Sequence, residues 1–208
     1  MNALPVKSFN LNLVNAPLEK LLEPGSLSRI FLMALESFPT IQQVTNPVIF
    51  LGRPSGGQLH INPAGVFFRD IETEKFDEDL EDFFEIIKTY HSECKISELK
   101  ELGLRLIFYS KAILSEGRRK LLTYNIEIPD KPFPSLPDSI IHIGLRFIFT
   151  VGVNRYDIKI EPRLSNLQEN YFDFNVIIPK PIKVEDAFSI INEQREFFNE
   201  SILPVIAR

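Results

Sequence analysis

Glu101-Leu-Gly-Leu-Arg-Leu-Ile-Phe-Tyr-Ser110 has the composition of a β-strand, and most of its pattern returns in Ile141-His-Ile-Gly-Leu-Arg-Phe-Ile-Phe-Thr-Val151. In each stretch a single arginine, Arg105 or Arg146, stands within a run of Leu, Ile and Phe. A guanidinium that is buried without a partner is too costly to be retained. Each arginine must therefore face solvent, pair with a carboxylate or bind an anionic ligand.

Side chains alternate between the two faces of a strand, so each arginine shares its face with the glycine two residues before it and the isoleucine two residues after it. The interpretation we favour is pairing across the sheet face with an acid on a neighbouring strand, such as Asp157 or Asp173. The alternative is that Arg105 and Arg146 together hold a small anionic ligand, either a carboxylate or a phosphate.

The rest of the chain predicts a sheet of short strands and three longer helices. Short turns between the strands allow only antiparallel pairing. We expect an α+β fold with a largely antiparallel, curved sheet, helices packed on one face and a long C-terminal helix. Strands are predicted over 6–14, 48–51, 59–61, 66–68, 101–110, 122–128, 140–151, 156–160 and 172–178, and helices over 26–37, 76–91 and 183–203.

Residues that begin helices or interrupt regular structure lead to two more expectations. Ser26 is predicted to cap the first of these helices. The chain of 208 residues is interpreted as a single α+β domain over 1–208, and the proline-rich connector 129–137 leaves open an organisation in two lobes. We interpret the two Gly-Leu-Arg segments as strands of one sheet rather than as a duplication, because an acidic helix precedes one and the proline-rich connector precedes the other.

Composition limits the classes of function. The net charge is -5 and the sequence pI about 5.3, so the chain lacks the basic field of a non-specific nucleic-acid binder. The single cysteine, Cys94, excludes an intramolecular disulfide and suits a reducing compartment. No secretory leader or membrane span is predicted, so we expect a cytoplasmic protein without a membrane partner.

Catalytic and metal sites are not indicated. His60, His91 and His142 are scattered without ligand spacing, and one cysteine cannot complete a zinc tetrad. Cys94 follows His91 by three residues, which suggests a Cys/His pair only loosely; a structural thiol is the interpretation we favour. The sequence thus predicts no catalytic residue, no metal and no cofactor.

The basic cluster Arg118-Arg119-Lys120 follows Gly117 and is either a solvated turn or a patch for nucleic acid or a phosphoryl group. The acidic net charge makes nucleic acid an unlikely partner. Binding of nucleic acid or of a phosphoryl group by this cluster is therefore the third of three functional hypotheses. The first is a non-enzymatic domain that associates with itself or with a protein partner through its sheet face or edge, and the second is an anionic-ligand binder or enzyme using Arg105 and Arg146.

Three features together resemble a sporadically distributed family of bacterial proteins with no assigned function. They are the early strand 9–14 followed by a helix, the Gly103-Leu-Arg-Leu-Ile strand after a helix, and Tyr171-Phe-Asp-Phe-Asn-Val-Ile followed by a long closing helix. The family pattern has Tyr-Ile-Asn after Gly-Leu-Arg, where this chain has Leu-Ile-Phe. The resemblance implies a fold spanning nearly the whole chain and a cytoplasmic setting, and it brings no catalytic residues.

Overall fold

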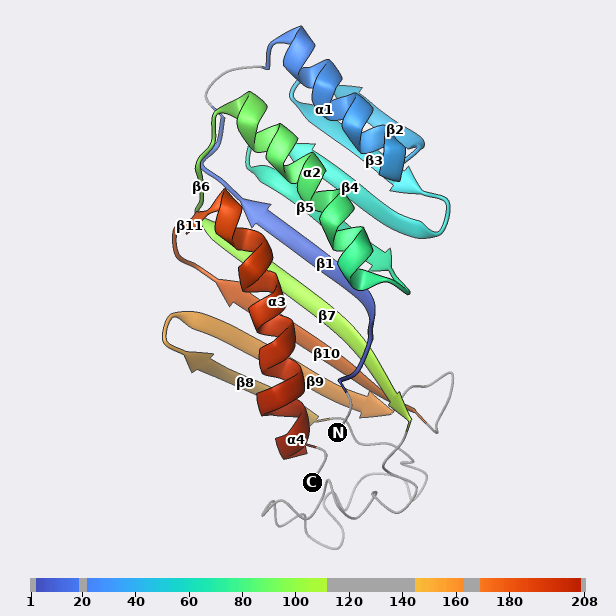
Figure 1. Cartoon of the computed structure of the whole chain (residues 1–208), viewed down its shortest axis with the longest axis vertical. Helices are drawn as coiled ribbons and strands as arrows, with labels where there is room; N and C mark the ends of the chain where they lie inside the picture. Colours follow the sequence, from blue (N-terminus) through green and yellow to red (C-terminus); the bar gives the residue numbers. More distant parts are fainter. Residues whose placement is uncertain (1–2, 19–21, 112–144, 163–168, 207–208) are drawn as a thin grey trace, which may run out of the picture.

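The computed structural model describes residues 3–18, 22–111, 145–162 and 169–206, and its main feature is one nine-stranded sheet (Figure 1). All neighbouring strands pair antiparallel, in the order β2-β3-β4-β5-β1-β7-β10-β9-β8. These strands are β1 (Val6–Val14), β2 (Thr40–Thr45), β3 (Val48–Arg53), β4 (Gly56–Asn62), β5 (Gly65–Glu72), β7 (Glu101–Lys111), β8 (Leu145–Val151), β9 (Asn154–Pro162) and β10 (Glu169–Ile178). A separate two-stranded ribbon pairs β6 (Glu98–Leu99) with β11 (Ile182–Lys183).

The helices lie together on one face of this sheet (Figure 1). They are α1 (Pro24–Ser37), α2 (Phe76–Cys94) and a C-terminal helical stretch made of η2 (Val184–Asp186), α3 (Ala187–Phe197), the π-helical turn η3 (Phe198–Ile202) and α4 (Leu203–Ile206). The predicted α+β class, with an antiparallel sheet and a long C-terminal helix, is confirmed. Among the described residues, no helix combines the length and the apolar character needed to cross a bilayer.

The sheet is made of two halves that share part of their order of elements, although α1 lies between β1 and β2 in the first half and residues 112–144 of the second half lie outside the described part of the chain. Each half begins with a central strand, β1 or β7, and these two strands are antiparallel neighbours. Each continues with a meander, β2 to β5 or β8 to β10, whose last strand returns to pair with the central strand of its own half. Each then ends in a helix, α2 or α3. The two Gly-Leu-Arg strands hold different places in this plan, because β7 is central and β8 is an edge.

The core forms where the apolar face of the sheet meets the helices. Phe83 of α2 stacks on Phe68 of β5 with ring centroids 4.5 Å apart, and Phe198 of η3 stacks on Phe108 of β7 at 4.2 Å. All four rings are fully buried. Burying a side chain of this size contributes about 1.5–3 kcal/mol, so these contacts fix the helices on this face. No helix of the described residues lies on the other face, which we call the uncovered face.

Two local expectations need correction. Ser26 does not cap α1, because the helix begins at Pro24, whose fixed φ suits the first helical position, and Ser26 is buried in the first turn. Strand β2 was not predicted at all. Every residue of β2 is exposed, so it lacks the alternation of buried and exposed residues by which a strand is recognised.

Candidate functional site

Arg105 lies on the face of the sheet that carries no helix, together with Ile107 of the same strand, as the alternation predicted. Its Nε and Nη2 donate to Oδ1 and Oδ2 of Asp173 on β10, both at 2.8 Å. Nη2 also donates to the hydroxyl of Tyr171 at 3.2 Å. The predicted pairing of this arginine with a carboxylate of a neighbouring strand is confirmed.

Asp173 is only 4% exposed although it stands on the uncovered face. It lies directly opposite Lys159 of β9, whose Nζ is 3.8 Å from Oδ2. The Asp173 carboxylate therefore lies between two cations, Arg105 and Lys159. The hydrogen bonds that Arg105 donates to it raise the pKa of the guanidinium above its ordinary value, against the opposing effect of burial. The group stays charged at every accessible pH.

Arg146 on β8 makes a similar pair with the second predicted acid. Its Nε and Nη2 donate to the two carboxylate oxygens of Asp157 at 2.8 and 2.7 Å. The hydrogen bond and charge of Arg146 lower the pKa of Asp157, and burial works against them. Arg105 and Arg146 are not brought together, because β10 and β9 lie between their strands.

Several predicted features lie outside the described residues. They are the basic cluster Arg118, Arg119 and Lys120, the predicted strand 122–128, the connector 129–137, and the first residues of the predicted strand 140–151, with His142 and Gly144.

Cys94 and His91 do not form an activated pair. The Nδ1 atom of His91 is 2.8 Å from the carbonyl oxygen of Ile87, so this nitrogen carries the proton, and Nε2 is buried without a hydrogen bond in the described part of the chain. Burial lowers the pKa of His91. Burial also raises the pKa of Cys94 to about 11, which keeps the sulfur a thiol at neutral pH.

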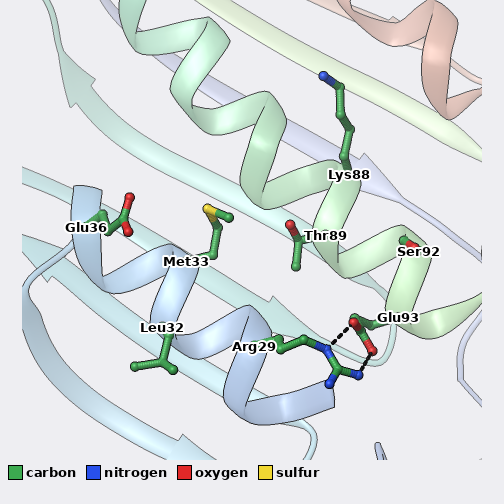
Figure 2. A pocket seen from close by; sticks show the side chains of 8 residues that line it. All are labelled: Arg29, Leu32, Met33, Glu36, Lys88, Thr89, Ser92 and Glu93. Carbon is green, nitrogen blue, oxygen red and sulfur yellow. Dashed lines mark hydrogen bonds and ion pairs between the residues drawn. The ribbon is translucent and has the colours of Figure 1, made fainter. Parts of the chain in front are cut away.

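A hollow of about 570 Å³ lies between α1 and α2 (Figure 2). An ion pair crosses it, in which Arg29 Nη2 donates to Glu93 Oε2 at 2.6 Å. Hydrogen bonds from Arg29 and Ser26 lower the pKa of Glu93 to about 2. Met33 lies between the helices and Leu32 is exposed, so the hollow is an open surface of mixed polarity in which Arg29 is already paired with Glu93.

Two further hollows flank the start of α2, and both are acidic. In one, of about 340 Å³, Arg53 donates to Asp79 at 3.0 Å. In the other, of about 540 Å³, Arg195 donates to Asp77 at 2.6 Å. No group of three or more His, Cys, Asp or Glu residues in the described ranges has the arrangement of a metal site. Neither Arg105 nor Arg146 lines any of these three hollows.

The two edge strands carry an unusual share of the exposed apolar side chains. At β8 and the turn that follows it, Phe147 is 41%, Ile148 71%, Val151 51% and Val153 57% exposed. These four residues form what we call the β8 patch. At the opposite edge only Ile41 and Val44 of β2 are comparably exposed. The sequence showed that 145–151 is apolar, but its position at an edge depends on the pairing order of the strands.

Comparison with protein-family models, with curated proteins and with solved structures finds no match to this chain. The functional argument therefore rests on the residues described above.

Proposed function

We propose that the protein is an association domain that binds a second copy of itself through the edge strand β8. The observation that carries this proposal is the β8 patch, Phe147, Ile148, Val151 and Val153, exposed on an edge strand that pairs only with β9 within the described part of the chain. Edge strands are ordinarily protected from pairing by charged residues, prolines or bulges. The only charged residue of β8, Arg146, is neutralised by Asp157, so the strand is left open to another strand.

The sequence of β8 is complementary to itself in an antiparallel arrangement about Ile148. In this register Ile148 lies opposite Ile148 of the second copy, and Phe147 lies opposite Phe149. Residues that lie opposite each other in this register point to the same face of the sheet. The helices of both copies therefore lie on the same side, and one continuous sheet runs through the dimer. Main-chain hydrogen bonds would then be formed along the edge of β8 that has no partner strand among the described residues.

Charge favours the same register. Arg146 lies opposite Thr150 of the second copy, so the two guanidinium groups are not opposed. A contact that uses one patch on both copies closes on itself and stops at a dimer. The proposal therefore predicts a defined dimer instead of a growing polymer.

The other edge is a weaker candidate for this contact. Strand β2 exposes Ile41 and Val44, but its remaining residues are Thr and Gln, so it has less apolar surface to bury. Pairing of β2 with β8 of another copy would leave one free edge at each end and would not close.

The anionic-ligand hypothesis gains no support from the geometry. Arg105 and Arg146 are each held by both oxygens of one carboxylate, and two strands lie between them. The nucleic-acid hypothesis depends on residues 118–120, which lie outside the described part of the chain. A cytoplasmic location, suggested by the single cysteine, belongs to the same proposal.

The experiment is multi-angle light scattering of the full chain over a range of concentrations, with one lysine variant for each edge. Ile148→Lys places a charge in the centre of the proposed contact at a side chain that is already exposed. Ile41→Lys makes the same change on β2 and serves as the matched control. We expect wild type and Ile41→Lys to be dimers and Ile148→Lys a monomer.

Three outcomes would contradict the proposal. They are a wild-type chain that stays monomeric at the highest soluble concentration, a dimer that survives Ile148→Lys, and polymers whose length grows with concentration.

A further inference from the structure

The uncovered face of the sheet carries a row of aromatic side chains at its first half. Phe50 of β3 lies directly opposite His60 of β4, and His60 lies opposite Phe67 of β5. The ring centroids are 5.6 and 6.1 Å apart. All three residues are only partly buried, so each keeps part of its surface accessible to solvent. The rings thus form a continuous stripe across three strands.

An amide extends this stripe toward the centre of the sheet. Asn12 of β1 lies opposite Phe67 on one side and opposite Gly103 of β7 on the other. A Cβ atom at Gly103 would come within 3.3 Å of Asn12 Nδ2, so the absence of a side chain there makes room for the amide. The glycine of the Gly-Leu-Arg segment therefore positions a polar group beside the rings.

These polar groups have unused hydrogen-bonding capacity. Within the described ranges, neither the Asn12 amide nor the imidazole of His60 makes a side-chain hydrogen bond. Cross-strand aromatic pairs stabilise many sheets, and that role accounts for the rings. It does not account for a half-buried amide and an imidazole left free beside them.

Few charged side chains lie near the stripe. Strands β2, β3 and β4 carry one formally charged side chain, Arg53, and its guanidinium is bound on the helix side to Asp79 and to the Ser37 carbonyl. On β5, Arg69 follows Phe67 by two residues, is exposed and lies opposite Gln58 of β4. Burial and the nearby charge of Arg69 lower the pKa of His60, so this ring is neutral at neutral pH. Platforms that stack nucleic-acid bases combine aromatic rings with a cationic groove. Among the described residues, Arg69 is a single exposed cation at the side of the row, which does not amount to such a groove.

We propose that Phe50, His60, Phe67 and Asn12 form a binding platform for a neutral oligosaccharide. The C–H faces of pyranose rings pack against aromatic rings, which offer an apolar surface with a negative face. Sugar hydroxyls can donate to the Asn12 carbonyl oxygen or to the free nitrogen of His60, and can accept from the Asn12 amide. Aromatic surface with a few fixed polar groups is the usual composition of a ligand site. The uncharged stripe suits a ligand without charge.

The test measures binding of the full chain to a broad glycan array, followed by calorimetry with the neutral hexasaccharides cellohexaose and maltohexaose. A heparin-derived hexasaccharide and a single-stranded oligothymidylate are the charged comparisons. We expect binding to neutral glycans that changes little with added salt. Phe50→Thr and Asn12→Ala are expected to weaken it on the order of tenfold each. Asn175→Ala, an amide of the same face outside the row, is the matched control and should bind as wild type.

Absence of binding to every neutral glycan on the array overturns the inference. So does binding that is equal in wild type, Phe50→Thr and Asn12→Ala, because the site would then lie elsewhere. Salt-sensitive binding of the oligothymidylate without binding of neutral glycans would assign the stripe to nucleic acid and would also overturn it. Asn12→Ala removes no buried apolar group, so it tests the site even if Phe50→Thr fails to fold.

Discussion

Asp173 receives two hydrogen bonds of 2.8 Å from Arg105 on the neighbouring strand, yet this bidentate pair stands on the face of the sheet that no helix covers. The acid is nearly inaccessible while 38% of the arginine side chain is exposed. Lys159 lies on the other side of the carboxylate, with Nζ 3.8 Å from Oδ2. The pair therefore links β7 to β10, and both oxygens of the acid already accept hydrogen bonds from Arg105.

Replacing Arg105 by Met and Asp173 by Asn, singly and together, should give a coupling of about 1–2 kcal/mol in the free energy of unfolding. The estimate is that of a charge-assisted bidentate pair, reduced because the arginine is partly screened by solvent. Urea titration of the four proteins measures it. The pair of Arg146 and Asp157 has the same geometry on an exposed edge, so its coupling should be smaller and more easily lost in salt. Equal coupling in the two cycles would show that burial of the acid is unimportant.

Gly65→Ala should destabilise the protein severely. Gly65 has φ +152° at the start of β5, and a Cβ atom there would overlap the carbonyl oxygen of Leu13 on β1. Neither backbone can give way without breaking the central pairing of the sheet, so we expect a loss of more than about 3 kcal/mol. Gly152→Ala is the matched control, because φ is +59° but the space is open, and its cost should be about 1 kcal/mol. Thermal unfolding of both variants decides the question.

His91 should make the protein less stable in mild acid. Burial lowers the pKa of His91 in the folded state, so the unfolded chain binds a proton that the folded chain resists. The free energy of unfolding is therefore unaffected by protonation of His91 well above its ordinary pKa of 6.5. It decreases as the pH falls below that value, by at most about 1.4 kcal/mol per pH unit. The acids with lowered pKa values, Glu93 and Asp157, titrate at lower pH.

Denaturant unfolding between pH 7.5 and 5 measures this slope. His91→Asn keeps a donor for the Ile87 carbonyl but cannot titrate, so it should remove most of the dependence. His60→Gln is the control and should change it less, because His60 is more exposed. An unchanged slope in His91→Asn would assign the dependence to other groups.

The Arg105 and Arg146 pairs were predictable because they depend on local properties of the sequence. Alternation along a strand fixes the face of each arginine, and the cost of an unpaired charge demands an acid nearby. Asp157 and Asp173 were acids in segments predicted to be strands of the same sheet, but which arginine each of them pairs with depends on the order of the strands. The buried strands and the helices were predictable for the same reason, because each has one apolar face.

The order of the strands was not predictable from such local patterns. That β8 is an edge, and that β7 lies between β1 and β10, depends on how the two halves meet. The aromatic stripe was missed for the same reason. Phe50, His60 and Phe67 stand on three different strands, and only the pairing register brings them into one row. The role of Gly103, which is to leave room for the Asn12 amide, likewise became visible only once the register paired these two residues.

Association through β8 should make thermal stability depend on protein concentration. A dimer that forms only from folded chains stabilises the folded state by mass action, so the melting temperature of wild type should rise as concentration rises. Ile148→Lys should show a constant melting temperature, equal to that of wild type at high dilution, because Ile148 is exposed and contributes little to folding of the single chain. Ile41→Lys should follow wild type. Scanning calorimetry over a hundredfold range of concentration measures the effect, and a wild-type melting temperature that does not move would contradict the proposed contact.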